Sequence, residues 1–174
     1  MKMSKIVLGM SLALGVASFG HAADQGHGTI TFEGSIIDAP CSIQQDTINQ
    51  TVDLGQVSKA ALANKGTSIP QNFEIKLDNC NLEEDKNSVS AKFTGTAGAT
   101  EGMLGMIGTA KGASIAVTDG SGKLLKLGTA TAAQALQDGS NALQFSAYLQ
   151  GDGVSGSVVP GDFTSVANFT LSYQ

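Results

Sequence analysis

Short runs in which apolar and polar residues alternate make up most of this chain, and they begin close to its N-terminus. Over residues 28–36 every second position is apolar or glycine, and the positions between them are polar. The first set is Gly28, Ile30, Phe32, Gly34 and Ile36, and the second set is Thr29, Thr31, Glu33 and Ser35. A period of two is typical of a β-strand that buries one face. We therefore predict a strand over residues 29–38, which Pro40 ends.

The same period recurs along the rest of the chain. It predicts further strands over residues 51–54, 72–80, 88–94, 114–118, 123–127, 142–150 and 163–173. The turn Asp119-Gly120-Ser121-Gly122 predicts that the strands on either side of it form a hairpin. Residues 58–64 favour one helical turn at most, and residues 81–87 and 95–112 are predicted loops. Many short strands separated by turns predict a single all-β domain, a sandwich or a barrel.

The first 22 residues have the pattern of a secretory signal peptide rather than of a folded element. Lys2 and Lys5 precede an uncharged apolar stretch over residues 6–19, and small residues stand at the two key positions of Gly20-His21-Ala22. This order predicts cleavage after Ala22 and export of the remaining chain. The apolar stretch is shorter than the about 20 residues that a membrane-spanning helix needs. An uncleaved N-terminal anchor is the alternative.

Charge narrows the possible partners. Without Lys2 and Lys5 the chain keeps eight lysines and no arginine against fifteen Asp and Glu residues, a formal net charge of −7. Nucleic acid and anionic lipid both require clustered positive charge, so neither is an expected partner. No later segment has the length and apolar character of a membrane span, and we expect no membrane insertion of the exported chain.

Two cysteines, Cys41 and Cys80, remain after the signal peptide. In an exported chain an even number of cysteines favours a disulfide. The loop that this bond closes has about 40 residues, for which the chain-entropy model gives roughly 4 kcal/mol of stabilisation. Two buried free thiols are the alternative.

Residues suited to catalysis or metal binding are scarce. His27 is the single histidine of the exported chain, which is too few for a zinc site or a Ser-His-Asp triad. The turn at Asp119 lacks the Lys-Ser/Thr pair of a phosphate-binding loop. A pair of catalytic carboxylates stays open, although the chain has no Trp and two Tyr with which to build a sugar platform. We expect no enzyme activity, no catalytic residue, no metal and no cofactor.

The end of the chain is as regular as its beginning. In the last predicted strand Ala167, Phe169, Leu171 and Tyr173 share one face, and Asn168, Thr170 and Ser172 share the other. Together with the opening strand, it is the clearest pattern in the sequence.

Several segments in this order resemble the major pilin subunits of chaperone–usher pili, closest to the P-pilus type. They are ITFEGSIIDAPCSI, VDLGQVS, LDNC and FTSVANFTLSYQ, with Tyr173 penultimate and Gly161 fourteenth from the end. The resemblance covers the whole chain. It implies an immunoglobulin-like β-sandwich that lacks its last strand and leaves an apolar groove, which the N-terminal extension of the next subunit fills.

The resemblance also implies roles for individual residues. The donor strand takes Gly26, Gly28, Ile30, Phe32 and Gly34 from an extension over residues 23–34, and the subunit domain spans 35–174. The acceptor groove and chaperone contact take Phe163, Ala167, Phe169, Leu171, Tyr173 and Gln174, with the terminal carboxylate held by basic residues of the chaperone. The implied partners are other copies of the chain, related pilins, a periplasmic chaperone and an outer-membrane usher. The implied destination is a surface fimbrium, reached through the periplasm.

Two alternatives stay open at this point. Residues 29–32 are also suited to pairing within their own sandwich, and the boundary near Gly34 is placed to within about two to four residues. The alternative function is a minor or adaptor pilin, or a small secreted carbohydrate-binding sandwich.

Overall fold

The computed structural model describes residues 26–174 apart from residue 84 and residues 154–157. The predicted signal peptide lies outside the described residues. The chain divides into two units, one that ends at Ile36 and one over Ile37–Gln174, and each is treated by itself. In the first unit residues 26–36 form no strand.

The second unit is almost entirely β-structure, as predicted. Its strands are β1 (Ser42–Ile43), β2 (Gln71–Cys80), β3 (Ser88–Gly95), β4 (Ile107–Gly108), β5 (Ala113–Asp119), β6 (Leu124–Leu125), β7 (Gln134–Ala135), β8 (Gly139–Gly151), β9 (Phe163–Thr164) and β10 (Ala167–Tyr173). Two helical turns, α1 (Gln45–Ile48) and η1 (Ala63–Lys65), lie between β1 and β2. The strands form a five-stranded sheet in the order β1-β2-β8-β5-β6, a three-stranded sheet β10-β3-β7 and a two-stranded sheet β4-β9.

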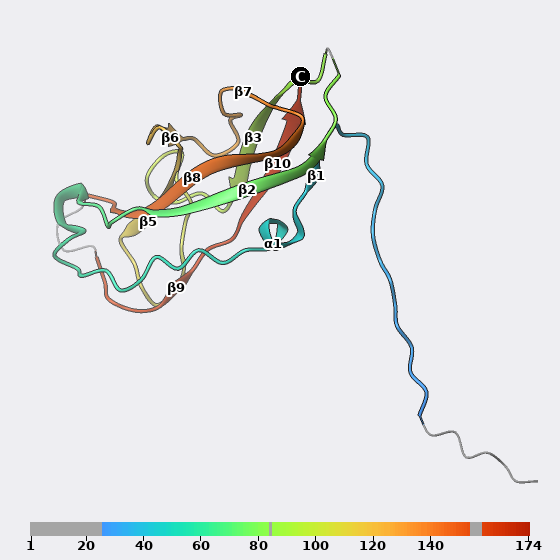
Figure 1. Cartoon of the computed structure of the whole chain (residues 1–174). Helices are drawn as coiled ribbons and strands as arrows, with labels where there is room; N and C mark the ends of the chain where they lie inside the picture. The colour runs from blue at the N-terminus through green and yellow to red at the C-terminus, as the bar shows by residue number, and fades with distance from the viewer. Residues whose placement is uncertain (1–25, 84, 154–157) are drawn as a thin grey trace, which may run out of the picture. The chain divides into compact units, whose positions relative to one another are not determined.

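The two larger sheets face each other across one hydrophobic core. Figure 1 shows β2, β8 and β5 in one layer and β3 and β10 in the other. Phe73 and Phe145 come from the first layer, and Phe93 comes from the second. The Phe93 and Phe145 rings meet edge to face with their centroids 5.0 Å apart, a favourable aromatic geometry. The unit is therefore a β-sandwich whose inward-facing residues alternate as the sequence predicts.

Most predicted strands are confirmed, and three differ in an informative way. The strand predicted over residues 29–38 does not form, and the chain pairs first at β1. Residues 51–54 are unpaired in the described part of the chain. The strand predicted over residues 163–173 is divided into β9, which pairs with β4, and β10, which pairs with β3. In the first two cases the alternation is present in the sequence, but a strand also needs a backbone partner. In the third case the chain changes its partner strand between Thr164 and Ala167.

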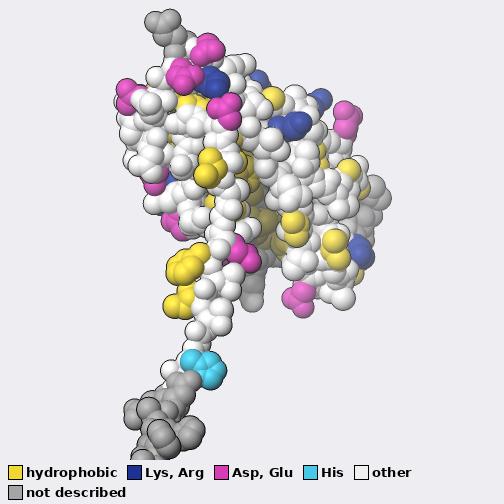
Figure 2. Space-filling view, turned by 90° about the vertical axis from the view of Figure 1, so that its right-hand side faces the viewer, with side chains coloured by type: hydrophobic (Ala, Val, Ile, Leu, Met, Phe, Trp, Pro, Cys, Tyr) yellow, Lys and Arg dark blue, Asp and Glu magenta, His cyan; other side chains and the backbone are white. Residues whose placement is uncertain are grey.

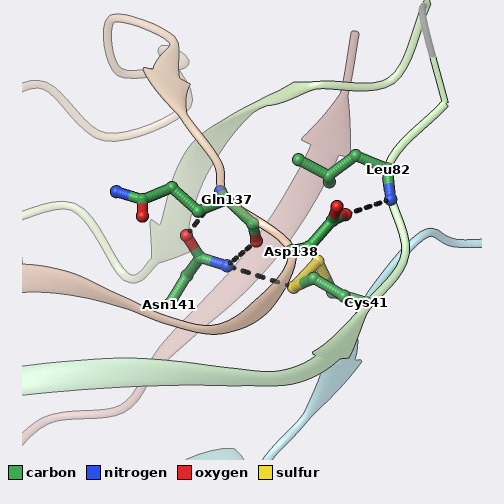
Figure 3. Close-up of a disulfide and its surroundings, with 6 residues drawn as sticks. Cys41, Leu82, Gln137, Asp138 and Asn141 are labelled. Carbon is green, nitrogen blue, oxygen red and sulfur yellow. Dashed lines mark hydrogen bonds between the residues drawn. A yellow bond between two sulfur atoms is a disulfide. The ribbon is translucent and has the colours of Figure 1, made fainter.

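The predicted disulfide joins Cys41, just before β1, to Cys80 at the end of β2. Around it, the Asn141 side-chain amide donates to Cys80 Sγ at 3.3 Å and to the Gln137 carbonyl at 2.7 Å. Figure 3 shows this cluster, with Asp138 accepting the backbone N–H of Leu82. The bond therefore ties the start of the sandwich to β2 and to the turn that precedes β8.

Replacing both cysteines by serine should lower the free energy of unfolding by roughly 4 kcal/mol, because the open chain regains the entropy of a loop of about 40 residues. Denaturant unfolding of the wild-type and Cys41→Ser/Cys80→Ser chains measures this difference, and wild-type protein treated with a thiol reductant is the matched control. Equal unfolding midpoints for the oxidised and the serine chains would contradict the prediction.

Candidate functional site

The inward face of β10 is less buried than that of its only described strand neighbour, β3. Opposite one another in the register are Phe169 and Phe93, Leu171 and Ala91, and Tyr173 and Val89. The three β3 residues are buried, with exposed fractions of 5%, 1% and 1%, respectively. The three β10 residues are only partly buried. Directly opposite residues share one face of a sheet, so the atoms that would complete the burial are absent on the far side of β10.

The backbone of β10 is open on that same side. Ser88 and Gln174 exchange two hydrogen bonds, of 2.9 and 3.0 Å, at the end of the β3–β10 pair. Bonded and non-bonded pairs alternate in an antiparallel ladder, so Ser172, Thr170 and Asn168 also bond to β3. The N–H and C=O groups of Tyr173, Leu171 and Phe169 then point to the free edge. The residues with half-buried side chains are thus the ones with unpaired backbone groups, and such an edge is a template for another strand.

Residues 51–57 line the same cavity as residues 163–165, which lead into β10, and they are the second wall of this opening. Val52, Leu54 and Val57 are partly buried, and the residues between them are exposed. No backbone–backbone hydrogen bond involves residues 51–57 within the part of the chain that the structure describes. The second wall therefore also has free backbone groups, and a groove runs between two segments that each lack a partner.

The groove widens into a cavity at the β9 end. The cavity has a volume of about 820 Å³. Leu54 lines it from one wall, Phe163 and Ser165 line it from the other, and Ile115 and Leu149 form its floor. Figure 2 shows hydrophobic side chains gathered in a hollow on one face of the molecule. A cavity of this size and lining is suited to large apolar side chains.

The structure brings most of the predicted acceptor residues together. Phe163, Phe169, Leu171 and Tyr173 pack against the core along the groove, whereas Ala167 is exposed. Gly161 lines the cavity, and a side chain there would place its Cβ 2.7 Å from the backbone nitrogen of Ala110. This close approach explains why the C-terminal motif has a glycine at that position.

The predicted donor residues lie in the other unit, in a segment without regular structure. Ile30 and Phe32 are 77% and 88% exposed. Ile36, which the prediction assigned to the subunit domain over residues 35–174, is also fully exposed. Gly26, Gly28 and Gly34 have no atom within 4 Å of a Cβ built on them. A run of large apolar side chains in water is costly, and each gains about 1.5–3 kcal/mol when buried.

Sequence reasoning did not assign the second wall to the groove. The alternation of Val52 and Leu54 was visible and predicted a strand, and the same signal identifies the wall once β10 is placed. Met106 and Val158, which also line the cavity, come from segments without any periodic pattern. Only the fold brings those two side chains to the site.

The described residues contain no group of three or more His, Cys, Asp or Glu side chains that would hold a metal ion. Within the same part of the chain no helix has both the length and the apolar character to cross a membrane.

Tyr173 offers a spectroscopic probe of the groove. Burial raises the pKa of the Tyr173 phenol above its ordinary value of 10.0. In Tyr148→Phe, which leaves one tyrosine in the exported chain, we expect the tyrosinate absorbance to rise at a higher pH when the protein is folded than when it is unfolded. The sign for stability follows, since the contribution is complete below the unfolded pKa and is lost as pH rises through the folded pKa. Coincident titrations of the folded and unfolded protein would contradict the prediction.

The chain is similar to known fimbrial proteins along almost its whole length. The family model described as "Fimbrial protein" matches residues 30–174. The chain is 57% identical to the "Fimbria A protein" of Serratia marcescens and 54% identical to the "Major MR/P fimbria protein" of Proteus mirabilis, in both cases over 100% of each chain. Among solved structures it is similar to the P pilus rod subunit PapA, with 34% identity and a TM-score of 0.69 over 78% of this chain and 100% of that one.

Proposed function

The chain belongs to the fimbrial protein family, and we propose that it polymerises into the rod of a surface fimbria by inserting residues 26–36 as a strand into the groove of the next copy. The observation that carries the proposal is the state of β10, whose inward side chains are half-buried and whose backbone edge is open. The same chain has a spare apolar stripe, with Ile30, Phe32 and Ile36 exposed. The extension of one copy thus has the apolar strand that the groove of the next copy lacks. A head-to-tail contact that does not close on itself produces a filament.

The cavity indicates the direction of the inserted strand. All strand pairs of the sandwich are antiparallel. An antiparallel donor places Ile36 at the β9 end of the groove and Gly28 beside Tyr173. A parallel donor would place Gly28 at the β9 end, where glycine has no side chain to occupy a cavity of about 820 Å³. We therefore assign Ile36 to the cavity and Ile30 and Phe32 to the groove along β10.

This assignment moves the end of the donor strand from Gly34 to Ile36. The alternation that begins at Gly28 continues without interruption through Ile36. The compact unit of the chain begins at the following residue, Ile37. Residues 37–41 then lead to Cys41, whose disulfide with Cys80 anchors the donated strand to its own subunit.

A groove of this kind needs a temporary occupant before assembly. An apolar groove between two unpaired edges is a site of aggregation while subunits are separate. A periplasmic chaperone that supplies a strand along β10 would protect it, and an outer-membrane usher would exchange that strand for the extension of the next subunit. The relatives and the PapA structure favour the rod subunit over an adaptor or a carbohydrate-binding module. The role is structural and needs no catalytic group.

Deleting residues 23–36 from the exported chain should abolish its ability to extend a fibre while leaving its groove able to accept a strand. We expect electron microscopy to show no fibres from the truncated chain alone, and gels of unheated samples to show no ladder of polymers. Mixed with the wild type, the truncated chain should shorten fibres by ending them. Fibres of normal length from the truncated chain alone would refute strand donation.

A further inference from the structure

The outer face of the three-stranded sheet is polar and has one charged side chain. Lys92 is the only charged residue in β3, β7 and β10. Its exposed neighbours on this face are uncharged: Thr94, Asn168, Thr170 and Ser172. Lys92 lies directly opposite Thr170 in the register. It makes no ion pair within the part of the chain that the structure describes.

The extension has one acidic residue on the corresponding face. Glu33 alternates with the apolar positions Phe32 and Gly34 and is the only Asp or Glu between residues 26 and 37. It is exposed and has no ion pair with any described residue. The nearest acidic residue in the sequence, Asp38, is already paired with Lys86 at 3.5 Å. Two single charges of opposite sign therefore have no ion-pair partner among the described residues.

Strand donation brings these two charges to the same surface. The donated strand becomes the outer neighbour of β10, so the order in the sheet is donor, β10, β3. Side chains of the donor that alternate with the inserted Phe32 must then point to the outer face. Glu33 of one copy and Lys92 of the next are separated by β10 alone, about 10 Å between the two strands at the usual strand spacing.

The cavity also sets the register. Ser165 lines the cavity, and placing Ile36 opposite Ser165 puts Phe32 opposite Phe169 and Glu33 opposite Asn168. Thr31 then lies opposite Thr170, which is the direct neighbour of Lys92. Lys92 is diagonally placed from Glu33, with its long side chain crossing the short Thr170 side chain. A slip of two residues that places Glu33 opposite Thr170 puts it directly in line with Lys92, whereas a slip in the other direction places it opposite Val166 and farther from Lys92. The apolar positions find apolar neighbours in each of these registers.

We propose that Glu33 of one subunit and Lys92 of the next form an ion pair across β10 that disfavours the register in which the donated strand slips away from Lys92. The inference rests on the proposed strand donation and adds a polar determinant to it. The apolar stripe supplies the affinity, and because its period is two, it distinguishes poorly between registers two residues apart. A single complementary charge pair disfavours the slip that moves Glu33 away from Lys92, since charge complementarity acts on specificity more than on affinity.

A charge-reversal cycle tests the pair in assembled fibres. Glu33→Lys and Lys92→Glu should each make fibres dissociate about two- to fivefold faster in denaturant, in line with the energy of an exposed ion pair. Every subunit of the polymer carries both changes in Glu33→Lys/Lys92→Glu, so the pair is restored and the wild-type rate should return. The differences should shrink in about 1 M salt, where charges are screened within about 3 Å. Lys123→Glu, in the exposed turn of the other sheet, is the matched control.

The outcomes separate this inference from strand donation itself. Single reversals that leave the dissociation rate unchanged would overturn the ion pair and leave donation intact. The same conclusion would follow if fibres of the double reversal dissociate as fast as the two single effects combined predict. Failure of donation appears instead as normal fibres from the chain that lacks residues 23–36. A single variant that forms no fibre, with assembly restored in the double variant, supports the pair.

Discussion

Phe32→Asp is expected to abolish fibre formation while the subunit still folds and forms its disulfide. Phe32 is 88% exposed in the single chain, so the change removes no contact of the isolated fold. In the proposed fibre contact the same position enters an apolar groove opposite Phe169, where an unpaired carboxylate would lose several kcal/mol of hydration. The lost hydration of the carboxylate and the lost burial of the Phe32 ring together predict a decrease in polymer of at least roughly a hundredfold. Electron microscopy and gels of unheated samples measure the effect.

Thr31→Asp is the matched control, because the two residues are neighbours in sequence and lie on opposite faces of the donated strand. We expect Thr31→Asp fibres to form, since the new carboxylate faces solvent on the outer surface of the sheet. Equal behaviour of the two variants, whether both assemble or both fail, would show that the alternation of residues 28–36 does not determine which face is inserted.

Leu171→Asp is expected to remove the opposite half of the contact. Leu171 has a partly buried side chain and an unpaired backbone edge, and the change places a carboxylate in the β10 wall of the groove. The variant should neither accept a donated strand nor bind a chaperone that pairs with β10. Its own extension is unchanged, however, and should still enter a normal groove. Ser172→Asp, one residue away on the outer face, is the control that should assemble.

Mixing the two defective variants gives the sharpest result. Phe32→Asp has a normal groove and Leu171→Asp has a normal extension, so together they should form a pair of subunits and nothing longer. A gel of the unheated mixture should show one new band at the size of a dimer. Long polymers in the mixture would contradict the assignment of Phe32 and Leu171 to the same contact. If Leu171→Asp does not fold, the unmixed sample will show this because it will lack folded, disulfide-bonded subunit.

The alternation of apolar and polar residues predicted some strands correctly and others not. In β2, β3 and β8 the alternation gave correct strands because each strand finds a neighbour within the chain. In β5 the residues from Ala113 to Thr118 are all buried, so alternation is lost because loops cover the outer side of that strand. Residues 51–54 alternate as a strand does and still have no described backbone partner. Patterning reports which face is buried, but it does not report whether a partner strand exists.

The sequence by itself determined the all-β class, the inward faces of the main strands, the disulfide and the apolar stripe of the extension. Each of these depends on local periodicity or on residue type, which a linear pattern contains. The tertiary structure decided that β10 has no described strand neighbour on the side away from β3, that residues 51–57 form the second wall, and that a cavity lies at the β9 end. Those features depend on which segments meet across the sandwich. The partial burial of Phe169, Leu171 and Tyr173 can be recognised only by comparison with their buried β3 neighbours.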